Sequence, residues 1–170
     1  MRETSIPSST GAGDLHVCTW PCDAPRAALL LIHGMSEHIL RYDEFARFLG
    51  SHGILVVGMD SASHGQSRRP EGPRGYFGPR DGWEHLVQDI HALRQSVEAA
   101  YPGLALLLMG HSMGSFLARS YAARQGADIR AFIFMGTAGP NVALPFAKRM
   151  AERELRGAAG DAPSPKLEKL

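Results

Sequence analysis

The chain has 170 residues, of which 44% are hydrophobic and 21% charged, and its 18 basic and 17 acidic side chains give a formal net charge of +1. This length suits one domain with enough apolar residues for a packed core, which excludes a disordered tail. The near-neutral charge excludes a nucleic-acid partner, because such binding needs an excess of basic groups to displace counterions.

Short apolar runs alternate along the chain with longer segments of helical periodicity. In chain order, the sequence predicts a strand at 14–20, a strand at 27–32, a helix at 41–52, a strand at 54–60, a helix at 83–101, a strand at 104–109, a helix at 112–125, a strand at 129–135 and a helix at 144–155. This alternation predicts an α/β fold, in which a mostly parallel sheet is flanked by helices. Residues 61–81 form a Gly-, Pro- and Arg-rich loop, which is too long for a simple connection.

No segment has the features of a membrane span or a secretion signal. The apolar runs fall far below the roughly 20 residues that cross a bilayer. Residues 1–13 are polar and lack the apolar centre of a signal peptide, so we expect a cytoplasmic protein. Cys18 and Cys22, the only cysteines, fit neither a paired zinc motif nor a C-x-x-C redox motif. We expect both to be free thiols.

The segment Gly110–Gly114 reads Gly-His-Ser-Met-Gly and joins a predicted buried strand to a predicted helix. A G-x-S-x-G sequence at such a junction predicts a nucleophile elbow, a tight turn that raises the serine hydroxyl above the sheet edge. Side chains two residues either side of the serine would clash with their neighbours, which explains the glycines. Ser112 is therefore the candidate nucleophile, and the backbone N–H of Met113 faces the place where an oxyanion would form.

A second motif, His33-Gly34-Met35, directly follows the predicted strand at 27–32. The loop after such a strand supplies the other backbone donor of an oxyanion hole in enzymes with this type of elbow. We therefore expect the N–H groups of Met35 and Met113 to converge on one oxygen. In other enzymes, losing one such donor costs roughly 3–4 kcal/mol of transition-state stabilisation.

Three motifs in order resemble those of the monoacylglycerol lipase/lysophospholipase branch of the α/β-hydrolases. They are His-Gly-Met-Ser-Glu-His with Arg-Tyr at 33–42, Met-Asp-Ser-Ala-Ser-His-Gly-Gln-Ser at 59–67, and the elbow at 110–114. Residues 75–83 are similar to bacterial members labelled lysophospholipases. The resemblance extends from Asp14 to about Gly139.

The resemblance implies a serine esterase that acts on carboxylic esters, most closely on monoacyl lipids, through an acyl-enzyme on Ser112. It implies oxyanion donors at Met35 and Met113, and it requires no metal and no other cofactor. Further positions would support the site by fixing its backbone: His33, Gly34, His111, Gly110 and Gly114.

Four more side chains are interpreted as supports of the site rather than as reacting groups. Glu37 and His38 are expected to hold the oxyanion loop. Asp60 ends a predicted strand and is expected to fix the loop that follows it by hydrogen bonds. His64, which lies between small residues in that loop, is expected to order it.

A serine needs a base to take its proton, and in this fold the triad follows the order Ser, Asp or Glu, then His. All 8 histidines lie before Ser112. Asp128 precedes a predicted strand and Asp161 lies in a polar tail, so neither is expected to be the triad acid. The resemblance then implies that residues 1–139 are the N-terminal part of a hydrolase core and 140–170 the start of a lid. We expect a C-terminally incomplete fold with little activity alone.

Two alternatives stay open. One is a non-catalytic acyl-lipid-binding or interaction module derived from a hydrolase, and the other is an enzyme whose second polypeptide supplies the missing strands and base. The elbow sequence does not separate an esterase from an acyltransferase or a peptidase of the same fold.

Three surfaces are candidates for contacts beyond the substrate. The strand at 129–135 would leave an apolar sheet edge that invites pairing with another chain. The segment 144–155 mixes apolar and basic residues, which is typical of an amphipathic helix on the sheet, a lid or a helix on an anionic membrane surface. Four arginines of the long loop are expected to be solvated rather than to bind a phosphate head group: Arg68, Arg69, Arg74 and Arg80.

Overall fold

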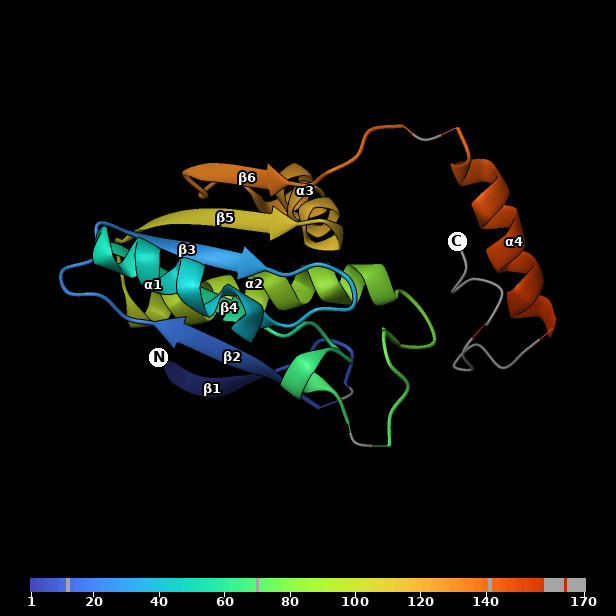
Figure 1. Ribbon diagram of the computed structural model, residues 1–170, viewed down its shortest axis with the longest axis horizontal. Helices are drawn as coiled ribbons and strands as arrows, with labels where there is room; N and C mark the ends of the chain where they lie inside the picture. Colours follow the sequence, from blue (N-terminus) through green and yellow to red (C-terminus); the bar gives the residue numbers. More distant parts are fainter. Residues whose placement is uncertain (12, 70, 141, 158–163, 165–170) are drawn as a thin grey trace. The chain divides into compact units, whose positions relative to one another are not determined.

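The computed structural model describes residues 1–11, 13–69, 71–140, 142–157 and 164. The chain divides into two compact units, residues 1–137 and residues 138–170. The first unit contains a six-stranded sheet with helices on both faces (Figure 1). The predicted α/β fold, a mostly parallel sheet flanked by helices, is confirmed.

The predicted strands and helices are present, with ends displaced by no more than two residues. The strands are β1 (Arg2–Pro7), β2 (Asp14–Trp20), β3 (Ala27–Ile32), β4 (Ile54–Met59), β5 (Ala105–His111) and β6 (Ala131–Met135). The helices are a short 3₁₀ turn (Ile39–Tyr42), α1 (Asp43–Ser51), a second 3₁₀ turn (Gly65–Ser67), α2 (Gly82–Ala100), α3 (Met113–Gln125) and α4 (Leu144–Gly157).

The strand order across the sheet is β1-β2-β4-β3-β5-β6. The four strands β4, β3, β5 and β6 run parallel to one another, whereas β2 pairs antiparallel with both β1 and β4. The loops after β3, β4, β5 and β6 therefore meet at one edge of the sheet, which is where open α/β sheets place their ligand sites.

Strand β1 is an element for which the sequence predicts no structure. Its residues pair with β2 from Arg2 opposite Thr19 to Pro7 opposite Asp14. It is an edge strand whose side chains are almost all exposed. An exposed edge strand does not need the alternation of apolar and polar residues by which strands are recognised in a sequence, so the polar sequence of β1 gives no indication of a strand. The hydrogen-bonded pairing with β2 is what defines it.

The two faces of β3 explain its unbroken apolar sequence. Leu30 and Ile32 pack on the face covered by α2 and α3, together with residues of both helices. Leu29 and Leu31 pack on the opposite face, which α1 covers. A strand buried on both faces needs apolar side chains at every position, as in other parallel sheets.

Helix α2 presents the predicted apolar stripe to this core. Leu86, Ile90, Leu93 and Val97 recur at helical spacing and are all buried. Cys18 is buried and Cys22 half-buried, and both are free thiols as predicted. Burial raises the pKa of the Cys18 thiol to about 12, so this group is a core side chain rather than a reactive thiolate.

The second unit is described mainly by α4. Its apolar side chains at Leu144, Phe146 and Leu155 are exposed. The expected division into a hydrolase core at 1–139 and a lid at 140–170 stays a prediction, and Asp161 lies outside the described residues. Within the part of the chain that is described, helices are too short or too polar to cross a bilayer.

Replacing Leu30 by alanine tests the two-faced packing of β3. Leu30 is fully buried, so Leu30→Ala is expected to lower the free energy of unfolding by about 2–5 kcal/mol, because truncation leaves a cavity. The matched control, Leu155→Ala, makes the same chemical change at an exposed position and should cost less than about 0.5 kcal/mol. Urea unfolding followed by circular dichroism measures both, and equal effects would contradict the packing described.

Candidate active site

Ser112 lies in a sharp turn between the end of β5 and the start of α3. Its backbone has φ +51° and ψ −118°, a conformation that residues other than glycine rarely adopt. Such backbone strain costs roughly 1–3 kcal/mol and is concentrated at functional sites. The turn is held by hydrogen bonds on both sides of the serine. The Ser112 N–H donates to the Met135 carbonyl at the end of β6 (2.9 Å), and the Ser115 N–H donates to the Ser112 carbonyl (2.9 Å).

At both glycines of the elbow sequence, a side chain would collide with backbone atoms of neighbouring residues. A Cβ atom at Gly110 would overlap the carbonyl of Gly114, and a Cβ at Gly114 would overlap the carbonyls of Ile32 and His33. Backbone atoms therefore leave no room for a side chain at either position, as the sequence predicts. The clash at Gly114 also shows that α3 begins in direct contact with the end of β3.

The loop after β3 lies directly beside the serine. A Cβ atom at Gly34 would approach the Ser112 Cβ to 3.0 Å and the Glu37 carboxylate to 2.8 Å. Met35, the next residue, is 69% exposed, whereas Met113 packs partly against the core. The structure thus brings the sequence-predicted residues of both motifs together, while the roles of their backbone N–H groups stay predictions.

Glu37 links this loop to the elbow through one carboxylate oxygen. Its Oε1 atom accepts hydrogen bonds from the Gly34 N–H, the Tyr42 hydroxyl (2.9 Å) and the His111 Nδ1 atom (2.9 Å). Arg41 pairs with its other oxygen at 3.4 Å. Burial by itself would raise the pKa of Glu37, but the hydrogen bonds from His111, Gly34 and Tyr42 outweigh burial and lower it. The ionised carboxylate therefore holds the loop, as the sequence predicts. His38 is exposed and makes no side-chain hydrogen bond within the described residues.

His33 joins the loop after β3 to the loop after β4. It is fully buried, with Nδ1 bonded to the Gly34 carbonyl (2.6 Å) and Nε2 accepting from the Ser61 N–H (2.9 Å). Burial lowers the pKa of His33, so the ring is neutral, with its proton on Nδ1. Both ring nitrogens are occupied. His33 therefore links the two loops and has no free ring nitrogen to act as a base, while its support of a catalytic site stays a prediction.

Asp60 fixes two loops from the end of β4. Its buried Oδ1 atom accepts from the Ile39 N–H (2.7 Å), and its Oδ2 atom accepts from the Gln66 N–H (2.8 Å). His16 on β2 lies 3.0 Å from Oδ2 through Nδ1 and reaches Glu3 on β1 at 2.9 Å through Nε2. The predicted role of Asp60 is confirmed, but the sequence shows no pattern that connects His16 to it.

His64 is buried inside the loop that follows β4. Its Nδ1 atom bonds to the Ala62 carbonyl (3.0 Å). Its ring lies 5.3 Å from the ring of His33 and stacks 5.8 Å from that of Phe77. These contacts order the loop, as the sequence predicts.

The described residues do not provide Ser112 with a base. Within this part of the chain, no side chain forms a hydrogen bond with the Ser112 hydroxyl, and the neighbouring His111 uses Nδ1 to contact Glu37. Asp128 pairs with Arg94 at 2.8 Å. It precedes β6 and so lies at the amino ends of the parallel strands, whereas Ser112 lies at their carboxyl ends. The described residues also contain no group of three or more His, Cys, Asp or Glu side chains placed to hold a metal ion.

Comparison with known proteins agrees with this geometry. The family model described as "Serine aminopeptidase, S33" matches residues 23–161. The chain belongs to this family of α/β-hydrolases. Within it, the similarities to monoacylglycerol lipases place the chain in the branch that its three motifs resemble.

Three of the similar proteins show how much of a longer chain these residues match. Monoglyceride lipase of Homo sapiens is 37% identical over 105 residues, which are 62% of this chain and 33% of that protein. Monoacylglycerol lipase of Mycolicibacterium smegmatis is 33% identical over 134 residues, 77% of this chain and 46% of that protein. The crystal structure of a thermostable carboxyl esterase from Bacillus coagulans has a TM-score of 0.84 and 29% identity, and the similarity covers 92% of this chain and 50% of that one. The chain thus spans about a third to a half of the length of these proteins.

Replacing Glu37 by glutamine tests its role as the charged link between the loop and the elbow. Glu37→Gln is expected to lower the free energy of unfolding by about 2 kcal/mol at neutral pH, as for other hydrogen bonds to charged groups. The pKa of Glu37 is lowered from its ordinary value of 4.5 in the folded protein. Its ionised form therefore stabilises the fold above that value, and this stabilisation is lost as the pH falls through the folded pKa. Urea unfolding at a series of pH values should show the difference between the two proteins shrinking in acid.

The matched control is Glu71→Gln, an exposed change in the long loop after β4 and outside any helix. Its unfolding free energy should follow that of the unchanged protein at every pH. A Glu37→Gln effect that stays constant well below pH 4.5 would mean that the charge of Glu37 does not hold the loop.

Proposed function

We propose that this chain carries the nucleophile of a serine hydrolase that cleaves carboxylic esters, with Ser112 forming the acyl-enzyme. The observation that carries the proposal is the strained turn at Ser112, which lies at the carboxyl ends of the parallel strands, so close to Gly34 that a Cβ atom there would approach the Ser112 Cβ to 3.0 Å. The lipase and esterase names of the similar proteins support this reaction class. A strained serine with no structural task of its own is otherwise hard to explain.

The chemistry follows from where the charges develop. The Ser112 hydroxyl attacks the ester carbonyl while a base takes its proton, and the carbonyl oxygen becomes an oxyanion. The N–H groups of Met35 and Met113 donate to that oxyanion, and each donor contributes about 3–4 kcal/mol. The protonated base returns its proton to the leaving alcohol. The same base then takes a proton from water, which attacks the acyl carbon, and returns that proton to the Ser112 oxygen as the bond between this oxygen and the acyl carbon breaks and the acid leaves.

We assign the base and its acid to residues outside these 170. No histidine follows Ser112 in this chain, and the ring nitrogens of His33 are both occupied in the structure. On this proposal the 170 residues hold the nucleophile and the oxyanion hole, and by themselves they have little activity.

Monoacyl lipids are the proposed substrates. The similar proteins named as monoglyceride and monoacylglycerol lipases support this class. Helix α4 fits it as the first part of a lid, because exposed Leu144, Phe146 and Leu155 share the helix with Lys148, Arg149 and Arg153. A helix of this composition rests with its apolar side on a lipid surface while its basic groups meet anionic head groups.

The edge strand β6 is the proposed place where further protein joins the sheet. Ile133, Phe134 and Met135 are large apolar side chains, and all three are exposed. On the side away from β5, no strand of the described residues pairs with β6. Such an edge accepts another strand by main-chain hydrogen bonds. Added strands, from the same or another polypeptide, would bring the acid and base to the carboxyl ends of the strands, where Ser112 lies.

A binding module is the second candidate function. It is favoured by one observation, namely that the Ser112 hydroxyl forms no hydrogen bond within the described part of the chain. Such a module would keep the acyl pocket and the oxyanion hole and would bind an acyl lipid without cleaving it.

A fluorophosphonate probe separates these functions because it reacts only with an activated serine. We expect the protein translated from the uninterrupted reading frame around these residues to label rapidly, and Ser112→Ala to abolish labelling. Ser120→Ala, a control on the same helix, should leave labelling unchanged. The 170-residue chain should react about 10⁴-fold more slowly or worse, as other serine enzymes do without their base.

Three outcomes would contradict the proposal in different ways. Efficient Ser112-dependent ester cleavage by the 170-residue chain alone would show that its base is already present. A stop codon directly after codon 170 would favour a split enzyme or the binding module. A longer, folded protein that binds fatty acid yet resists the probe would establish the binding module.

A further inference from the structure

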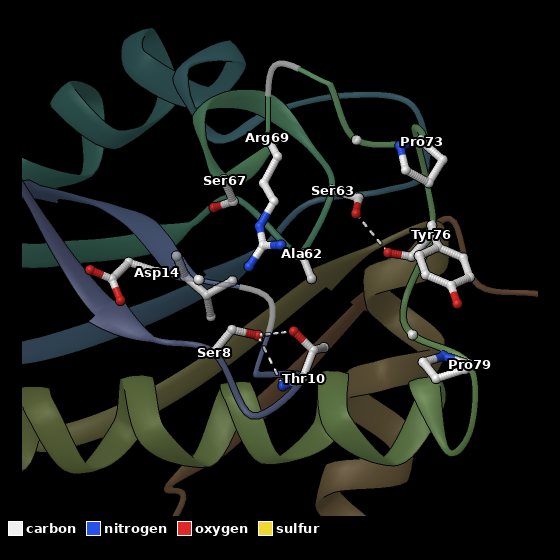
Figure 2. Close-up of a pocket in the computed structure, with 14 residues that line it drawn as sticks. Ser8, Thr10, Asp14, Ala62, Ser63, Ser67, Arg69, Pro73, Tyr76 and Pro79 are labelled. Carbon is white, nitrogen blue, oxygen red and sulfur yellow. Dashed lines mark hydrogen bonds between the residues drawn. The ribbon is translucent and has the colours of Figure 1, made fainter. Parts of the chain in front are cut away.

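A cavity of about 220 Å³ lies between the turn that joins β1 to β2 and the long loop after β4 (Figure 2). Its walls are mainly apolar and comprise Leu15, Ala62, Pro73, Tyr76 and Pro79. It is built near the β1 edge of the sheet, and strands β4 and β3 separate β2 from β5, which carries the elbow. None of the residues of the Ser112 site lines it.

The serine hydroxyl groups in the wall already donate to partners within the protein. Ser63 donates to the Tyr76 carbonyl (2.6 Å), and Ser67 donates to the Asp60 carbonyl (2.7 Å). Ser8 donates to the buried carboxylate of Asp89 (3.2 Å). These bonds fix the shape of the cavity, because they tie the loop and the β1–β2 turn to the elements beneath them.

Arg69 is different from these groups. Its side chain reaches from the long loop into the cavity (Figure 2), and a Cβ atom at Gly13 in the facing turn would lie 3.8 Å from its Nε and Nη2 atoms. The Arg69 carbonyl accepts a hydrogen bond from the Gly72 N–H (3.0 Å), but within the described residues its guanidinium has neither an ion pair nor a hydrogen bond. Asp14 also lines the cavity, but its carboxylate points away from Arg69 in Figure 2 and accepts a hydrogen bond from the Ser5 hydroxyl at 3.4 Å.

We propose that this cavity binds a small organic monocarboxylate, whose carboxylate pairs with the Arg69 guanidinium and whose apolar body fills the space beside Tyr76. A guanidinium offers two parallel N–H donors that match the two oxygens of a carboxylate. Apolar walls with one or a few polar groups that orient the ligand are the usual composition of small-molecule sites. Inorganic phosphate would meet the charge but leave the apolar wall in contact with water.

The volume sets the size of the ligand. An engineered apolar cavity of about 150 Å³ in another protein holds benzene. A cavity of about 220 Å³ therefore has room for one six-membered ring, or a short branched chain, together with a carboxylate. Benzoate is the probe of matching size, and benzamide is its neutral counterpart.

Titration of the isotope-labelled chain with benzoate, followed by amide NMR shifts, tests the proposal. We expect saturable shifts at Gly13, Ala62 and Tyr76. Arg69→Gln should weaken binding at least tenfold, and Arg69 is exposed, so this variant should fold. Arg74→Gln removes the same charge from an exposed position of the same loop that does not line the cavity. It should change the affinity less than twofold, and benzamide should bind at least tenfold more weakly than benzoate.

Several results would overturn the inference. Equal binding of inorganic phosphate and benzoate, or equal effects of the two arginine variants, would show attraction by the basic loop alone. Shifts confined to the residues around Ser112 would place benzoate in the candidate active site. The inference does not depend on the proposed hydrolase activity, because Ser112→Ala should leave benzoate binding unchanged even if that activity is absent.

Discussion

The Oε1 atom of Glu37 accepts hydrogen bonds from the Gly34 N–H, the Tyr42 hydroxyl and the His111 ring. These three groups belong to the loop after β3, to the short helical turn that follows it and to the elbow at the end of β5. A buried carboxylate needs several donors to stay ionised, and here the donors are the parts of the site that must keep their relative positions. The distance between the Gly34 backbone and Ser112 therefore depends on an electrostatic contact that neither loop provides by itself.

The backbone of the site and its reactive chemistry have different sources. The elbow, the loop of Gly34 and the supports His33 and Asp60 are held by hydrogen bonds within residues 1–137. These bonds run between loops at the carboxyl ends of the parallel strands, so they depend on how those strands are arranged. Proton transfer is not provided by these hydrogen bonds, since it requires a base with a free ring nitrogen at the Ser112 hydroxyl. Residues 1–137 thus hold Ser112 in a strained turn beside the loop of Gly34, and on the proposed function its activation depends on a base that this hydrogen-bond network does not include.

How far the sequence predicts this structure depends on how local the physical cause is. The elbow was predictable because the glycines at 110 and 114 are required by steric clashes within a five-residue segment. Strand β3 was predictable because burial on both faces requires apolar side chains throughout. Strand β1 was not predictable, since an exposed edge strand has no apolar pattern. The contact of His16 with Asp60 was not predictable either, because it joins residues far apart in the sequence. Glu37 lies between these cases. Its motif indicates a support, but only the fold shows that His111 is one of its donors.

Strand β6 has a further consequence because of where it ends. The carbonyl of Met135, its last residue, accepts the Ser112 N–H at 2.9 Å, and the side chain of the same residue is exposed on the open edge of the sheet. The backbone position of Ser112 is therefore tied directly to the end of this edge strand. A strand that paired with β6 would form its main-chain hydrogen bonds beside the peptide group that holds the turn of Ser112, so strand addition at this edge would bear directly on the geometry of that turn.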